Sequence, residues 1–184
     1  FGAPALISAT GGPLKILVAD LNGDTRPDVI GDTSTVDQYS VWLGSGSGVF
    51  SGPTTVTGSA SCSSILAIGD LNGDTKPDVA LGGSDRLQIA FGNGDGTFRF
   101  GARIDTPRIA FTLTGARPVA QIGDFNGDGN LDLFVQAASF APGAYILYGT
   151  GTDTLLAPDP VLVPFGMSWV FKADVDGDGR DDLL

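Results

Sequence analysis

The sequence contains no histidine and no glutamate, and its one cysteine is Cys62. A His-based catalytic triad, a His metal site and a Glu general acid cannot be built from this chain alone. An internal disulfide is excluded too, and we expect Cys62 to be a small buried hydrophobic residue. No run of eighteen apolar residues occurs, so we expect no membrane-spanning helix. The chain begins at Phe1 without a signal peptide, which predicts a processed or excised segment.

Positive charge is also scarce. There are 10 Lys and Arg residues against 21 acidic residues, all of them Asp, and the formal net charge is −11. This balance disfavours nucleic-acid binding through a basic field. The many Gly, Pro, Ser and Thr residues argue against a mostly helical fold. Because 42% of the residues are hydrophobic, the chain is expected to fold around a core and not to be an acidic disordered tail.

Four segments of the sequence repeat one acidic motif, and their leading Asp residues are spaced by 50, 54 and 50 positions. That spacing fits a four-stranded propeller blade and is too long for a leucine-rich repeat. The four segments are residues 19–29, 69–79, 123–133 and 173–183.

Short apolar, β-branched and aromatic runs surround each motif and predict strands. The first strands are nearly all apolar, which predicts burial on both faces. They are expected at 15–19, 65–69, 119–123 and 169–173. Second strands are expected at 28–30, 78–81 and 132–136, and third strands at 39–43, 87–91 and 145–148. Fourth strands should start at Phe50 and Phe98, after the Gly-rich turns 44–48 and 92–96.

This pattern predicts an all-β fold of β-propeller blades, each with four antiparallel strands, and about 3.5 blades in the chain. Residues 1–184 would form a single propeller segment with repeats at about 1–49, 50–97, 98–154 and 155–184, the last incomplete. Phe1-Gly-Ala-Pro matches Phe50-Ser-Gly-Pro, so we expect the chain to open on a fourth strand. The third unit departs from the pattern at 147–155, where no Gly-x-Phe introduces a fourth strand.

Each motif places side-chain oxygens at its first, third, fifth and ninth positions and a Gly at the fourth. Such alternating oxygens on a tight loop can converge on one hard cation, and the seventh residue can add its carbonyl. With water this gives about six or seven oxygens, which suits Ca²⁺ better than Mg²⁺. Up to four Ca²⁺ ions are predicted, one per motif. The predicted ligands are Asp20, Asn22, Asp24, Arg26, Asp28, Asp70, Asn72, Asp74, Lys76, Asp78, Asp124, Asn126, Asp128, Asn130, Asp132, Asp174, Asp176, Asp178, Arg180 and Asp182.

EF-hand loops and metal-free turns are the two alternatives to this metal site. An EF-hand needs a Glu at position twelve and flanking helices, whereas that position holds Gly31, Leu81 and Val135 in the first three motifs and the flanks are predicted strands. Metal-free turns are the other alternative, because Asp-x-Asn-Gly-Asp is also ordinary turn composition.

The succession of Phe-Gly-x-Pro, an apolar strand, Asp-x-Asn-x-Asp-x-x-x-Asp and Gly-x-Gly-x-Gly-x-Phe resembles the FG-GAP/VCBS repeat over essentially the whole chain. That repeat forms blades in integrin α-subunit propellers and in many secreted bacterial and fungal proteins. The resemblance implies a β-propeller with Ca²⁺ between the first and second strands of each blade. A ring of about seven blades is usual in the family, so this chain would be roughly half a ring. A secreted or cell-surface location is implied.

A ligand is expected on the propeller face opposite the Asp motifs, where the repeats differ most. The candidate contacts are Tyr39, Arg86, Arg108, Arg117 and Trp169, since aromatic and Arg side chains are frequent in binding surfaces. Core packing of Trp169 and ordinary solvated surface for the Arg residues are the alternatives.

Three functions are compatible with these features. The first is a calcium-stabilised binding or adhesion module for a glycan or a protein, lectin-like or integrin-like. The second is a domain of a secreted polysaccharide-degrading enzyme, although the missing His and Glu argue that the chain itself is not an enzyme. The third is an architectural subunit whose ring is completed by a second copy or another chain. We expect calcium to be structural, with direct ligand bridging as the alternative.

Overall fold

Strands make up the regular structure of the described residues, and no helix occurs among them. The computed structural model describes residues 15–58, 62–83, 86–106, 119–136, 143–162 and 170–184. β-Branched and aromatic runs between Gly- and Asp-rich turns favour short strands of this kind. None of the described segments is a helix of the length and hydrophobicity that a membrane crossing requires.

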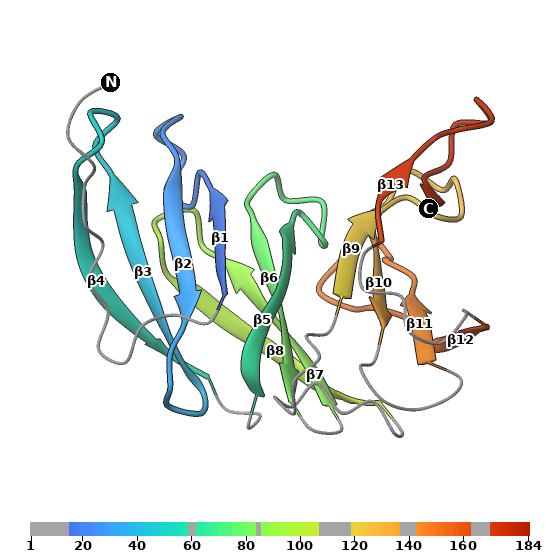
Figure 1. Cartoon of the computed structure of the whole chain (residues 1–184), viewed down its shortest axis with the longest axis horizontal. Helices are drawn as coiled ribbons and strands as arrows, with labels where there is room; N and C mark the ends of the chain where they lie inside the picture. The colour runs from blue at the N-terminus through green and yellow to red at the C-terminus, as the bar shows by residue number, and fades with distance from the viewer. Residues whose placement is uncertain (1–14, 59–61, 84–85, 107–118, 137–142, 163–169) are drawn as a thin grey trace.

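Three four-stranded antiparallel sheets follow one another along the chain (Figure 1). In each, sequence neighbours pair, as expected for propeller blades. The first sheet contains β1 (Ile16–Ala19), β2 (Asp28–Asp32), β3 (Gln38–Gly44) and β4 (Phe50–Thr57). The second contains β5 (Cys62–Gly69), β6 (Asp78–Gly83), β7 (Arg86–Gly92) and β8 (Phe98–Asp105). The third contains β9 (Val119–Gly123), β10 (Asp132–Gln136), β11 (Gly143–Leu147) and β12 (Asp159–Leu162). A two-stranded sheet follows, with β13 (Lys172–Ala173) and β14 (Asp182–Leu183).

The all-β fold and the four-stranded blades are thus confirmed. The predicted strands 119–123 and 132–136 coincide with β9 and β10, and β4 and β8 start at Phe50 and Phe98 as predicted. In the third unit, β12 forms only after a turn closed by an isolated bridge between Gly149 and Leu155. The proposed opening strand at Phe1 lies outside the described residues.

The sheets are offset from the repeat units expected at 1–49, 50–97, 98–154 and 155–184. Each fourth strand pairs with the third strand before it, as in Gly44 with Phe50 and Gly92 with Phe98. The full sheets therefore span 16–57, 62–105 and 119–162, because after each third strand the chain turns back and its next strand pairs with that third strand.

Neighbouring sheets pack through their apolar faces. Leu21, Ile30 and Val41 of the first unit share a buried cluster with Ile65 and Val79 of the second. A second cluster joins the second and third sheets, and its buried members are Leu66, Ala67, Leu71, Ala80, Leu87, Ile89, Phe91, Leu133, Val135, Tyr145 and Leu147.

Cys62 belongs to the cluster between the first and second sheets. It is 0% exposed, which confirms its expected burial. Burial, reinforced by the nearby Asp37 carboxylate, raises the pKa of the Cys62 thiol to about 12. The thiol is therefore protonated near neutral pH.

Burial of the first strands differs from the prediction. β5 lies between β1 and β9 and is buried, as expected. On β1, however, Ile16 and Val18 are 52% and 56% exposed, and β13 is exposed throughout. A strand is buried on both faces only where sheets cover it on both sides. The apolar sequence of β1 was therefore not sufficient to predict its burial.

Candidate metal centres

Each acidic motif forms a loop between the first two strands of its sheet. We call residues 20–28, 70–78, 124–132 and 174–182 the first to fourth Asp loops. The loops share one register: the residue before the loop pairs with its ninth residue, as in Ala19 with Asp28 and Gly69 with Asp78. The third and fourth loops repeat this pairing. All four loops lie along the same edge of the molecule (Figure 1).

The first Asp of each loop accepts backbone N–H groups from the middle of the loop. In the second loop, the Asp70 Oδ1 accepts from Gly73 and Asp74 at 2.8 and 3.0 Å, and its Oδ2 accepts from Thr75 at 2.8 Å. Equivalent bonds reach the other first-position residues, which are Asp20, Asp124 and Asp174. These bonds satisfy the turn's N–H groups and fix each carboxylate inside the loop.

The third and fifth positions each accept the N–H two residues further on. In the second loop, the Asn72 Oδ1 accepts from Asp74 at 3.1 Å and the Asp74 Oδ1 from Lys76 at 3.0 Å. The same Asx turns occur at Asn22, Asp24, Asn126, Asp128, Asp176 and Asp178. Alternate side chains therefore turn to the same side of the backbone.

The ninth Asp has a structural role that the sequence did not reveal. Asp78 is 0% exposed; its Oδ2 accepts the Leu71 N–H and its Oδ1 the Gly92 N–H, both at 2.9 Å. It thus joins the start of its loop to the end of the third strand. Asp28 and Asp132 make the same pair of bonds, to Leu21 and Gly44 and to Phe125 and Gly149.

Burial raises the pKa of Asp78 to about 6 despite these bonds, and burial raises that of Asp132 as well. Each carboxylate oxygen has a second lone pair, so an Asp that accepts these two backbone hydrogen bonds can still bind a metal ion. The recurrence of a Gly at or just after the third strand of each full sheet, at Gly44, Gly92 and Gly149, was the available signal for it. At Gly92 a Cβ would lie 2.3 Å from the Pro77 carbonyl oxygen, so only Gly allows this approach.

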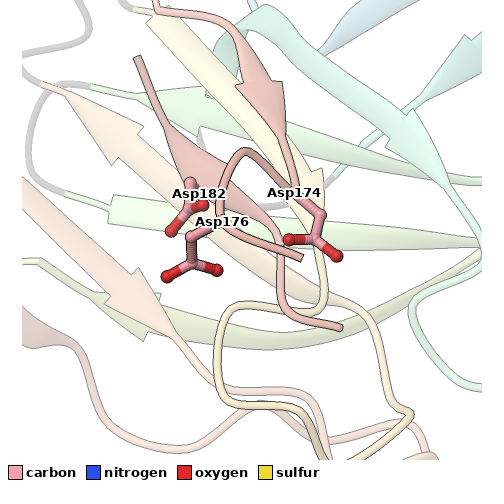
Figure 2. A group of neighbouring side chains, drawn as sticks. All are labelled: Asp174, Asp176 and Asp182. Carbon is pink, nitrogen blue, oxygen red and sulfur yellow. The ribbon is translucent and has the colours of Figure 1, made fainter. Parts of the chain in front are cut away.

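The fourth loop brings three carboxylates together. Ligand oxygens of Asp174, Asp176 and Asp182 lie within 4.8 Å of one another, and Figure 2 shows Asp174 facing the other two across the turn. An oxygen-only set of this kind fits a hard cation such as Ca²⁺. In the other loops Asn supplies a neutral oxygen at the third position. The donor chemistry of all four loops therefore fits the predicted metal.

The seventh residues place cations beside the fifth carboxylates. Arg26, Lys76 and Arg180 have side-chain nitrogens 3.8–3.9 Å from Asp24, Asp74 and Asp178. These exposed pairs contribute little to stability. Asn130 occupies the seventh position of the third loop. Metal binding through the backbone carbonyl groups of these four seventh-position residues stays a prediction.

The candidate ligand contacts are only partly described. Tyr39 is 1% exposed, and its hydroxyl donates to the Cys62 carbonyl at 3.0 Å. Its expected place on a binding surface is therefore wrong, because the ring packs between the first two sheets. Arg86 is half-buried at the start of β7, at the opposite end of its sheet from the second Asp loop. Arg108, Arg117 and Trp169 lie outside the described residues.

The antiparallel four-stranded sheets and the repeated Asp loops define a protein built of propeller blades. The FG-GAP-like repeat model matches residues 20–81, 70–135 and 124–184, and the chain belongs to this family. No curated protein matches the chain significantly.

Two solved structures share the fold. One is an Agrocybe aegerita lectin described as specifically recognising non-reducing terminal N-acetylglucosamine; it has 24% identity and a TM-score of 0.64 over 90% of this chain and 44% of its own. The other is BBS1N in complex with ARL6DN, with 14% identity and a TM-score of 0.55 over 86% of this chain and 46% of its own. This chain spans less than half the length of either structure.

Proposed function

We propose that this chain is a calcium-stabilised propeller segment that binds a glycan or a protein outside the cell. The observation that carries the proposal is the fold shared with a glycan-binding lectin over 90% of this chain. A binding module is also consistent with a chain that has no His or Glu and whose Asp residues are largely committed to loops. We therefore favour binding over catalysis.

The Asp loops support the calcium part of the proposal. Their carboxylates repel one another at short range, and a divalent cation would offset that repulsion. Extracellular modules bind Ca²⁺ with Kd on the order of 10⁻⁴–10⁻³ M, so such sites would fill outside cells and empty in the cytosol. Filling them stabilises the folded state by mass action. This supports a secreted or cell-surface setting.

The ligand would contact the sheet ends opposite the Asp loops. Arg86 is the candidate ligand contact that the structure places there. Arg108, Arg117 and Trp169 remain candidates from the sequence. Separation of the ligand surface from the Asp loops gives calcium a structural role.

A glycan array probed with the labelled chain tests this function, with glycans ending in N-acetylglucosamine as the first probes. We expect binding in Ca²⁺ and its loss in chelator. Arg86→Ala should weaken binding about tenfold, as the loss of a central Arg contact commonly does. Lys172→Ala, at the Asp-loop end of β13, is the control and should bind normally. Cleavage of a bound polysaccharide by the purified chain would instead support the enzyme alternative.

A further inference from the structure

The second Asp loop is held from outside by the next sheet. Asp153 lies in the turn between Gly149 and Leu155, and its Oδ1 accepts the Asn72 Nδ2 at 3.0 Å. The contact joins residues 81 positions apart in the sequence. The backbone also approaches closely, since a Cβ on Gly73 would lie 3.7 Å from the Gly151 carbonyl oxygen.

Arg99 fixes Asp153 in this position. Its Nη2 donates to the Asp153 Oδ1 at 2.6 Å, and its Nη1 lies 2.5 Å from the Oδ2. The guanidinium also lies 4.6 Å from the centre of the Phe91 ring. A two-point Arg–carboxylate contact has a defined orientation, so Asp153 presents one oxygen to Asn72.

In the first and third loops, the side-chain amide of the third-position Asn has a different acceptor from that of Asn72. The Asn22 Nδ2 donates to the Asp24 Oδ2 at 3.3 Å, and the Asn126 Nδ2 to the Asp128 Oδ2 at 2.9 Å. In both loops the Asn amide therefore donates to the Asp at the fifth position of the same loop. Asn72 instead donates to Asp153 and is 7% exposed, whereas Asn126 is exposed.

We propose that Asp153 is a positioning residue for the second Asp loop, and that this loop binds Ca²⁺ more tightly than the first and third loops, which have the same types of side-chain ligand. The inference rests on the proposed calcium function. With its amide held by Asp153, the Asn72 side chain is oriented before the ion arrives, and the Asp74 Oδ2 accepts no bond from that amide. Fixing ligands in advance lowers the ordering cost of binding.

Calorimetric Ca²⁺ titration of the whole chain carrying Asp174→Ala, which removes a ligand of the fourth loop with its additional carboxylate, tests the proposal. Asp153→Ala should weaken the tightest binding step by about tenfold, as removal of a ligand's hydrogen-bond partner commonly does. The matched control is Asp95→Ala, in the corresponding turn of the second sheet, where Asp95 bonds to Thr97 of its own turn. The control should change that step by less than about twofold.

Arg99→Met separates orientation from charge. It removes the cation that holds Asp153 but leaves the Asp153 carboxylate in place. A weaker tightest step would support positioning, whereas an unchanged or tighter step, as expected from the loss of a nearby positive charge, would overturn it in favour of a plain charge effect.

Asp74→Ala identifies the loop concerned. It should abolish the tightest step, and adding Asp153→Ala should then have no further effect. Persistence of the tightest step in Asp74→Ala would overturn the ranking of the loops. Absence of Ca²⁺ binding in the unchanged chain would instead refute the calcium function itself. Circular dichroism of each variant checks that the fold is kept.

Discussion

At the scale of single residues, the sixth position of every Asp loop has a left-handed backbone, but it is Thr in the first two loops and Gly in the last two. Thr25 and Thr75 have φ of 65° and 70°, while Gly129 and Gly179 have 84° and 85°. A β-branched residue is strained in this region, and Gly is not. The first two loops therefore contain local strain that the last two lack.

Thr75→Gly should stabilise the calcium-free protein by about 1 kcal/mol, because the relieved strain exceeds the added flexibility of the unfolded chain. The measurement is urea unfolding in chelator. Thr54→Gly, at an extended position in β4, is the control and should lower stability. Equal losses in the two variants would contradict the strain argument.

At the scale of secondary-structure elements, the ninth Asp joins three parts of each full sheet. Asp78 begins β6, holds the start of its loop through Leu71 and holds the end of β7 through Gly92. Asp74 is more exposed and accepts within its own loop. The two carboxylates, both predicted as metal ligands, therefore differ in what they do without metal.

Asp78→Asn should destabilise the protein by about 2 kcal/mol even in chelator, since the new amide NH₂ would face a buried N–H donor. Asp74→Asn should change stability in chelator by less than about 0.5 kcal/mol but should reduce the stabilisation produced by added Ca²⁺. Urea unfolding with chelator and with Ca²⁺ measures both. Equal effects of the two variants in chelator would refute the division of roles.

Some of the contacts between sheets lie at the Asp-loop edge. The Gly96 N–H donates to the Leu21 carbonyl at 3.0 Å, and the Asp181 N–H donates to the Asp124 carbonyl at 2.8 Å. The Asp181 Oδ2 additionally accepts the Asp124 N–H and the Lys172 ammonium. Each Asp loop thus lies against a segment of a neighbouring repeat, so metal binding would stiffen the contacts between sheets.

At the scale of the whole molecule, acidic loops lie along one edge and apolar side chains remain exposed on outer elements. Ile16 and Val18 on β1, and Phe171 and Leu184 beside the last sheet, are each more than half exposed. Further blades would cover such side chains. A second copy or another chain could supply them, which is the architectural alternative to a simple monomeric segment.

Native mass spectrometry with Ca²⁺ and after chelation tests this arrangement. We expect about four Ca²⁺ ions per chain, since each loop offers an oxygen-rich site. Pairing of two copies predicts a dimer in Ca²⁺. A calcium-loaded monomer would contradict pairing between copies, and the absence of bound Ca²⁺ would contradict the metal assignment.

The sequence by itself determined the local plan of this protein. The repeated Asp motif fixed where loops lie, and the apolar runs around it predicted the strands. These features depend on neighbouring residues and on turn chemistry, so they can be read from a short window.

Only the tertiary structure decided how these elements meet. It buried Tyr39, exposed Ile16, gave Asp78 its two backbone partners and brought Asp153 to Asn72. Such contacts depend on which sheet covers which face and on how closely turns of successive sheets approach. Repeat spacing specifies a blade, but the packing of blades against one another sets burial and the partners of each polar group.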